Sequence, residues 1–233
     1  MFPSSLHYFP LAWPFVILLA ALLGALFGLV AFRVLNFVSG SMGVSANTMF
    51  VLLVLSLLGS YINIPAAYLP EREVTAAAQV SFFGVTYIVP VVRQWPATVI
   101  AVNFGGAVIP VLLSIYLAVK NRLYIPGLIA IAVVAGVCHL LAYPVRGIGI
   151  AEPIFVPPLV TAVAALALSR RHAAPLAYIG GSLGTLIGAD LMNLDKVQGL
   201  GAPIASIGGA GTFDGIFVTG LLAVLYAGLA NRR

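Results

Sequence analysis

The sequence predicts an all-α polytopic membrane protein with about seven transmembrane helices and a small outer β-hairpin. Its 233 residues are 62% hydrophobic and only 7% charged, whereas soluble domains carry about 25% charged residues. The mean hydropathy of +1.13 indicates the same class. Such a chain cannot cover itself with a water-compatible surface, which excludes most soluble enzyme folds and large nucleic-acid-binding modules.

Apolar stretches close to membrane-spanning length recur along the chain and justify the helix count. They cover residues 14–38, 46–67, 97–119, 124–143, 150–169, 173–192 and 213–231. Residues 1–14 lack the basic region and the cleavage site of a signal peptide, so we expect this segment to lie at the membrane interface. The whole chain, 1–233, is expected to form a single membrane domain.

The basic residues are distributed as the positive-inside rule requires. With the C-terminus in the cytoplasm, the inner segments hold basic residues and no acidic one: Arg33, Lys120, Arg122, Arg170, Arg171, Arg232 and Arg233. The outer segments hold fewer basic residues, Arg72, Arg93, Arg146 and Lys196, together with Glu71, Glu73 and Asp195. This pattern predicts a multi-pass protein of the cell (inner) membrane with its N-terminus outside. It also explains the net charge of +5 without a nucleic-acid partner.

Residues 74–95 have a different composition from the apolar stretches around them. They are rich in β-branched and aromatic residues and are broken by Gly84 and Pro90, which favours strand over helix. Because unpaired strand edges cannot face lipid, we expect a β-hairpin at the outer surface. The alternative is a short additional hydrophobic segment in the membrane.

Polar side chains are rare in the predicted spans, so their positions are informative. Asn63, Asn103, Glu152, Asp190 and Asp214 all fall near the outer ends of their spans, and only His139 falls nearer the middle. This distribution predicts an outward-facing polar cluster. The alternative is that each residue caps a helix or contacts lipid headgroups.

Glycine is concentrated between Ile179 and Gly220. Gly180, Gly184 and Gly188 repeat at intervals of four, the small-residue spacing that lets helices pack closely. Residues 199–213 form a predicted Gly-rich loop that leads into the last helix. There Asp214 either stabilises the positive end of the helix dipole, with Thr212 as the cap, or has a functional role.

The functional hypothesis combines Asp190 and Asp214. They end one predicted helix and begin the next, so two antiparallel neighbours would bring their carboxyls together on one side. Two close carboxylates share a proton, and the pair can activate water as aspartic peptidases do. The same acids, with Asn103 and the carbonyls near Gly208 and Gly209, would alternatively bind a translocated cation or proton. A third reading is a non-catalytic scaffold or complex subunit.

A wider set of residues accompanies the two aspartates as candidates. Glu152 and Arg146 are close in sequence and form a predicted ion pair or interfacial group. The candidate substrate- or ion-binding residues are therefore Asn103, Arg146, Glu152, Gly208, Gly209, Gly211 and Thr212, and the candidate catalytic residues are Asp190 and Asp214.

No metal or cofactor is predicted. Cys138 is the single cysteine and His139 has no matching ligand pair. Signatures for phosphate loops, haem, zinc and nucleotides are missing from the sequence. The predicted partners are the lipid bilayer, a membrane-embedded peptide or small ion as substrate, and a second copy or another membrane subunit against the glycine stripe.

Five motifs carry a resemblance to a known family: FFGVTYIVP, NFGGAVIP, GIGIAEPIFVPPL, GTLIGADLMNL and SIGGAGTFDGIFVTG. Over about residues 45–230 the chain resembles a family of prokaryotic integral membrane proteins of unknown function. The resemblance implies that the segments carrying Asp190 and Asp214 belong to one module, and it implies no activity.

A more remote resemblance connects the chain to the membrane-embedded aspartic peptidases of the presenilin, signal-peptide-peptidase and prepilin-peptidase group. It implies that Asp190 is the first catalytic aspartate and that Asp214, after Gly209-Ala210-Gly211, is the second. The sequence departs from that pattern in three respects. Thr212 and Phe213 separate the glycines from Asp214, the loop between the aspartates is short, and no Pro-Ala-Leu motif follows.

Overall fold

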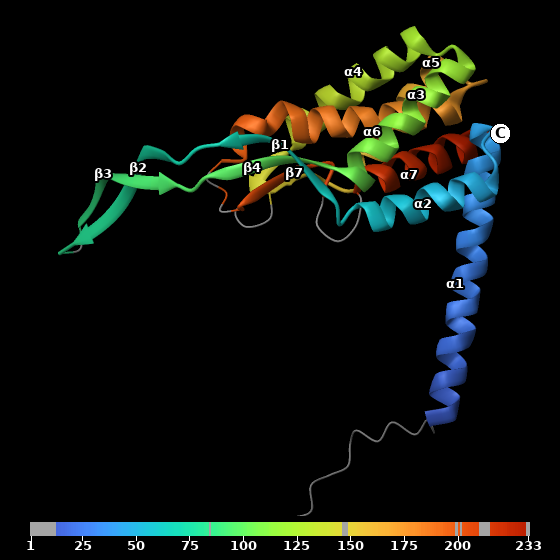
Figure 1. The fold of residues 1–233 in the computed structure, drawn as a ribbon, viewed down its shortest axis with the longest axis horizontal. Coiled ribbons are helices and arrows are strands. Elements are labelled where there is room, and N and C mark those ends of the chain that lie inside the picture. The colour runs from blue at the N-terminus through green and yellow to red at the C-terminus, as the bar shows by residue number, and fades with distance from the viewer. Residues whose placement is uncertain are drawn as a thin grey trace, which may run out of the picture.

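The fold is mostly helical, with small sheets gathered at one end of a helical bundle (Figure 1). The computed structural model describes residues 13–83, 85–145, 149–198, 200, 202–209 and 215–231. Its α-helices are α1 (Trp13–Met42), α2 (Ala46–Gly59), α3 (Ile109–Asn121), α4 (Tyr124–Leu141), α5 (Val156–Leu168), α6 (Ala173–Thr185) and α7 (Gly215–Ala230). The structure also has two π-helical segments among the described residues. Segment η1 (Phe104–Val108) precedes α3, and segment η2 (Leu186–Asp190) follows α6. A 3₁₀ segment, η3 (Leu191–Lys196), follows η2.

Among the described residues, three helical segments are long and apolar enough to cross a membrane: Val16–Met42, Phe104–Asn121 and Tyr124–Leu141. Helices α2, α5 and α7 are apolar but shorter. This finding fits the predicted membrane class, while the count of seven spans stays a prediction. Helix α1 extends away from the other helices, and its apolar side chains from Ile17 to Val34 are exposed (Figure 1).

Three predicted spans contain strand where helix was expected. Residues 46–67 are helical only to Gly59, and β1 (Asn63–Leu69) follows. Residues 97–119 begin with β4 (Thr98–Asn103). Pro65 lacks the N–H that a helix needs, and Val99, Ile100 and Val102 favour strand, but the two segments become strands by pairing with each other.

Residues 150–169, the third of these predicted spans, also begin with strand. The short strands β5 (Tyr143–Val145) and β6 (Gly149–Ala151) pair antiparallel, and α5 begins only at Val156. Pro157 and Pro158 occupy the first turn of α5. Backbone N–H groups in the first turn make no hydrogen bond within the helix, so proline is tolerated there.

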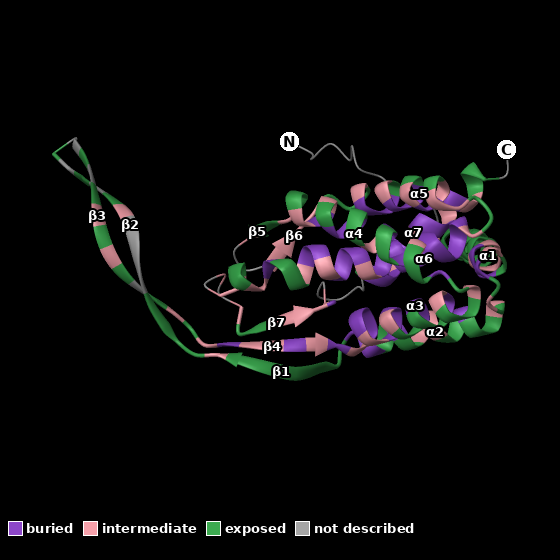
Figure 2. Ribbon diagram, turned by 90° about the horizontal axis from the view of Figure 1, so that it is seen from above, coloured by how far each residue is buried: buried purple, intermediate pink, exposed green. Residues whose placement is uncertain are grey.

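The predicted hairpin at 74–95 is confirmed and is longer than expected. Strands β2 (Arg72–Phe82) and β3 (Val85–Trp95) pair antiparallel, and β1 pairs with β4 beyond them, so one ribbon runs from Asn63 to Asn103. The ribbon projects from the bundle instead of capping it (Figures 1 and 2). Residues 72–82 and 85–95 are strands, so no helix in this part of the chain supports the alternative of an additional membrane segment.

A further strand lies within the predicted Gly-rich loop. Strand β7 (Ile204–Ile207) pairs in parallel with β4, which gives a three-stranded sheet in the order β1-β4-β7. The all-α prediction missed this sheet because β7 is only four residues long and forms through a distant partner. Residues 1–12, in the predicted interfacial segment, lie outside the described residues.

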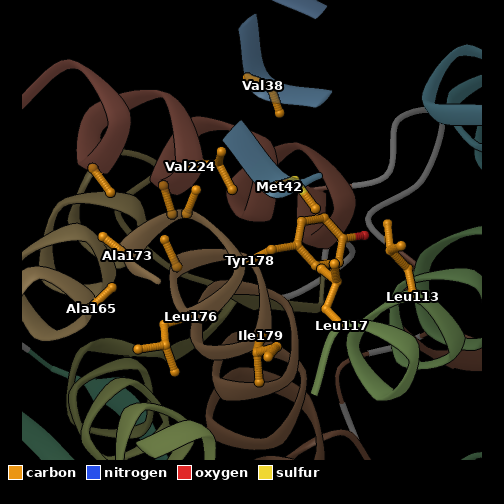
Figure 3. Packing of buried hydrophobic residues seen from close by; sticks show 14 of the residues in the cluster. Val38, Met42, Leu113, Leu117, Ala165, Ala173, Leu176, Tyr178, Ile179 and Val224 are labelled. Atoms are coloured by element: carbon orange, nitrogen blue, oxygen red, sulfur yellow. The ribbon is translucent and has the colours of Figure 1, made fainter. Parts of the chain in front are cut away.

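Helix α6 forms the centre of the bundle (Figure 2). Its Tyr178 side chain is fully buried and lies near Met42, Leu113 and Leu117 (Figure 3). The ring also meets Phe217 of α7 edge-on, with centroids 6.1 Å apart. Burial of such large apolar side chains stabilises the bundle away from its lipid-facing surface.

The glycine stripe on α6 packs against α4, as the spacing predicted. A Cβ atom on Gly180 would lie 3.0 Å from the Cβ of Ala130, and one on Gly184 would lie 2.6 Å from the Cβ of Val134. A Cβ on Gly188 would overlap the backbone of Ala135. The stripe is thus occupied by α4 within the chain.

Candidate functional site

Helix ends from different parts of the chain meet beside the three-stranded sheet. Parallel strands β4 and β7 lie in register from Val99 opposite Ile204 to Val102 opposite Ile207. Each strand leads directly into glycines, at Gly105-Gly106 and at Gly208-Gly209. Two of the sequence motifs, NFGGAVIP and SIGGAGTFDGIF, are therefore neighbours in space.

Gly208 makes the close contact between these motifs. Its φ is +80°, and a Cβ atom here would lie 2.7 Å from the amide nitrogen of Ala107. An L-residue is strained in this conformation, and the neighbouring backbone leaves no room for a side chain. Glycine is thus required at position 208 for two separate reasons.

Asn103 connects four segments around this contact and is 1% exposed. Its Nδ2 donates to the carbonyl oxygen of Ser60 at 2.7 Å and to Oδ1 of Asn63 at 3.1 Å. Its Oδ1 accepts from the amide of Gly106 at 2.8 Å and caps η1. Ser206 of β7 also donates to Oδ1 of Asn63. These contacts give Asn103 a structural, capping role.

Asp190 lies at the end of η2, partly buried, with its carboxyl directed toward the second glycine motif. The amide of Gly208 donates to its Oδ2 at 2.6 Å. The helix end behind it is closed by Asn193, whose Nδ2 donates to the carbonyls of Gly188 and Ala189 at 2.9 and 3.0 Å. Lys196 in turn donates to Oδ1 of Asn193 at 2.7 Å. Asp190 is thus held on a well-supported helix end.

Glu152 brings a second carboxyl to Asp190. It lies between β6 and α5, outside the helices, and interacts with Asp190 and with the thiol of Cys138 on α4. Burial raises the pKa of Glu152 from 4.5 to about 7; the nearby charge of Asp190 also raises it, and a hydrogen bond from Cys138 opposes the shift. Its Oε2 is buried and has no hydrogen-bond partner within the described segments.

Cys138 belongs to the surroundings of both carboxyls. The Sγ atom of Cys138 lies 3.7 Å from Oγ1 of Thr185 on α6. The adjacent His139 has its Nδ1 buried, with no hydrogen-bond partner in the part of the chain that the structure describes. The site therefore combines α4, the β6–α5 connection and the α6–η2 helix.

The structure groups the predicted residues differently from the sequence hypothesis. The acid that faces Asp190 among described residues is Glu152, which the sequence paired with Arg146. Arg146, Gly211, Thr212 and Asp214 lie outside the described residues, and so does the predicted Asp190–Asp214 pair. Gly208 presents its N–H to the site, whereas the ion-binding hypothesis used carbonyls near Gly208 and Gly209.

Sequence reasoning missed Cys138 and Thr185 as members of the site. The signal available in the sequence was the position of Cys138. It lies close to the end of α4, on the same side of the bundle as Glu152 and Asp190. Across the described ranges, no group of three or more His, Cys, Asp or Glu residues is arranged to hold a metal ion.

The apolar helices and the acid pair at their sheet end are features expected of a membrane protein with a polar site near one surface. A family model described as "Protein of unknown function (DUF1614)" matches residues 57–226, and the chain belongs to this family. The match includes Glu152 and Asp190. Neither a curated protein nor a solved structure matches the chain. The comparisons give no support to the remote resemblance to aspartic peptidases.

Proposed function

We propose that this protein is a proton-conducting membrane transport protein in which Glu152 and Asp190 hold one exchangeable proton. The observation that carries the proposal is the electrostatic interaction of two carboxyls from separate elements, one of which has a buried oxygen without a hydrogen-bond partner among the described residues. Ionisable groups that face one another in a membrane protein are typical of proton relays. A single proton bound to one of the two carboxyls removes the repulsion between their negative charges.

The geometry assigns different roles to the two acids. Asp190 accepts a hydrogen bond from the amide of Gly208, which holds its carboxyl in place. Glu152 is buried near Asp190, and burial and the charge of Asp190 both favour its neutral form. In the proposed cycle Glu152 therefore takes up and releases the proton.

The surrounding backbone supports a functional reading. Segment η2, which ends at Asp190, is π-helical, and π-helical turns occur frequently at functional sites. The described acids Glu71, Glu73, Glu152, Asp190 and Asp195 all belong to the segments at the sheet end. Lys120, Arg122, Arg170 and Arg171 belong to the opposite end, so the positive-inside rule assigns the acid site to the outer side in this proposal.

Proton flux into sealed vesicles tests the proposal. The full chain is reconstituted around a trapped pH-sensitive dye, and a potassium diffusion potential drives protons inward. We expect wild-type vesicles to acidify faster than protein-free vesicles, and Glu152→Gln and Asp190→Asn to reduce the rate to the protein-free level. Asp195→Asn, an exposed acid at the same end, is the matched control and should keep the wild-type rate.

Two results would overturn the proposal. One is a wild-type rate equal to that of protein-free vesicles at either polarity of the potential. The other is undiminished flux in both the Glu152→Gln and Asp190→Asn variants. Elution profiles and thermal unfolding midpoints of each variant in detergent establish that a lost rate does not come from misfolding.

A second candidate function is hydrolysis of a membrane-embedded peptide by Asp190 and Asp214. The observation that favours it is the bond from Gly208 to Asp190, because Gly208 begins the segment that leads to Asp214. A cleavage assay on a labelled hydrophobic peptide tests this function. It requires that Asp190→Asn and Asp214→Asn each abolish cleavage, and it fails if either variant still cleaves.

A further inference from the structure

A pocket of about 510 Å³ lies at the end of the bundle opposite the acid site. It is bounded by the C-terminal part of α1, the loop between α5 and α6, and the end of α7. Figure 1 shows the end of α7 beside the end of α1 from which that helix turns away from the bundle. The pocket therefore lies where apolar helices reach their termini, the level at which lipid headgroups begin.

Two adjacent arginines, Arg170 and Arg171, line this pocket and are exposed. No salt bridge to either side chain occurs within the described segments, where the acids belong to the sheet end. Arginine presents a planar fork of donors that matches phosphate oxygens. The pocket is thus positively charged and its charge is uncompensated by the described residues.

The remaining walls are suited to an amphipathic ligand. Asn231 donates to the carbonyl of Arg170 at 2.9 Å and ties the arginine loop to α7. Ala173 and Ala174 begin α6, which has no side-chain cap, so its positive end adds amide donors beside the arginines. Phe37 and Ala227 give the pocket an apolar side.

We propose that this pocket binds the phosphate group of an anionic phospholipid. The arginines and the α6 N-terminus contact the headgroup, and the acyl chains leave along the exposed apolar surface of α1. The inference is independent of the proton site, because no residue is shared between them. A free phosphate ion would make the same contacts with the arginines, but it has no apolar part to contact Phe37 and Ala227.

Lipid titration of the detergent-purified full chain, followed by native mass spectrometry, tests the proposal. The probes are dioleoylphosphatidylglycerol, dioleoylphosphatidylcholine and inorganic phosphate. We expect preferential binding of the phosphatidylglycerol and no displacement by inorganic phosphate. Arg170→Gln combined with Arg171→Gln should weaken that binding by about tenfold or more. Arg170→Lys with Arg171→Lys keeps the charge and should give an intermediate loss.

Two matched controls separate the pocket from general surface charge. Arg122→Gln removes an exposed arginine at the same end but outside the pocket and should leave binding unchanged. Gly40 lines the pocket, and a Cβ there would meet nothing within 4 Å. Gly40→Leu should therefore fill the pocket and weaken binding with both arginines present, while Gly28→Leu, on the same helix in open space, should not.

The proposal is overturned if the double glutamine variant binds phosphatidylglycerol like wild type, or if Arg122→Gln weakens binding equally. Equal binding of the two lipids also contradicts it. Displacement by inorganic phosphate with the same arginine dependence would assign the pocket to a soluble anion and overturn the lipid assignment. Thermal unfolding midpoints establish that each variant is folded.

Discussion

The amide of Gly208 donates a hydrogen bond of 2.6 Å to Oδ2 of Asp190, and this bond joins the end of the α6–η2 helix to the turn after β7. The same glycine packs against the backbone of Gly106 and Ala107. One residue therefore connects the acid site to the sheet and to the start of η1. Any change in its backbone position alters the surroundings of Asp190.

Gly208→Ala should destabilise the protein by at least about 2 kcal/mol. The positive φ costs an L-residue about 1–2 kcal/mol, and the overlap of the new Cβ with Ala107 adds to this cost. Thermal unfolding in detergent measures the effect. Gly136→Ala, on α4 where a Cβ meets nothing within 4 Å, should be neutral or stabilising by up to about 1 kcal/mol. Equal midpoints for wild type and Gly208→Ala would contradict the packing described above.

Asp190→Asn should lower the pKa of Glu152. The negative charge of Asp190 is one cause of the raised value, and the substitution removes it. The carboxyl band of Glu152, identified by its absence in Glu152→Gln, can be followed by infrared spectroscopy on either side of pH 7. Asp195→Asn should leave the midpoint in place. A midpoint that does not move in Asp190→Asn would show that the two carboxyls do not interact.

Stability should fall as the pH rises through the range set by Glu152. Its carboxyl has a pKa of about 7 in the folded protein against 4.5 for the free side chain, so between these values the folded state binds a proton that the unfolded state has lost. The contribution is complete below about pH 4.5 and is lost above about pH 7. It amounts to at most roughly 3–4 kcal/mol, since one pKa unit corresponds to about 1.4 kcal/mol.

Glu152→Gln should remove this pH dependence, because the amide does not titrate. Unfolding midpoints measured across the same pH range give the comparison. If the variant keeps the wild-type slope, another group is responsible for it and the raised pKa of Glu152 is wrong.

Gly188→Ala should separate η2 from α4. The new Cβ would overlap the carbonyl and Cα of Ala135, which belong to backbone and cannot rotate away. We expect a loss of about 1–3 kcal/mol from overpacking and a change around Cys138, one turn further along α4. Accessibility of the Cys138 thiol to a maleimide reagent, slow in wild type because the thiol is buried, should increase. Unchanged stability and labelling would contradict the close contact.

Sequence patterns predicted the features that depend on neighbours along the chain. The hairpin near 74–95 follows from β-branched residues interrupted by a glycine, and its pairing is confirmed. The glycine stripe at Gly180, Gly184 and Gly188 was expected to pack against a helix, and it does. Helix α4 lies close to its predicted bounds because its single proline, Pro126, falls in the first turn, where the missing N–H is tolerated.

The errors arose where partners far apart in sequence decide the conformation. Residues 63–69 are apolar enough to continue a membrane helix, but β4 offers them a ladder of backbone hydrogen bonds. Strand β7 forms for the same reason, through pairing with a strand about one hundred residues earlier. Local hydropathy contains no information about such pairing.

By itself the sequence determined the class of the protein. Composition and charge distribution set whether the side chains prefer lipid or water, and this preference does not depend on tertiary contacts. Its apolar stretches specify helices for a membrane, and its basic residues specify one end of the bundle. Only the tertiary structure showed that, among the described residues, Glu152 is the acid that interacts with Asp190. Glu152, Cys138 and Gly208 reach it from separate segments, and both their distances and the low polarity around Glu152 exist only after the helices have packed.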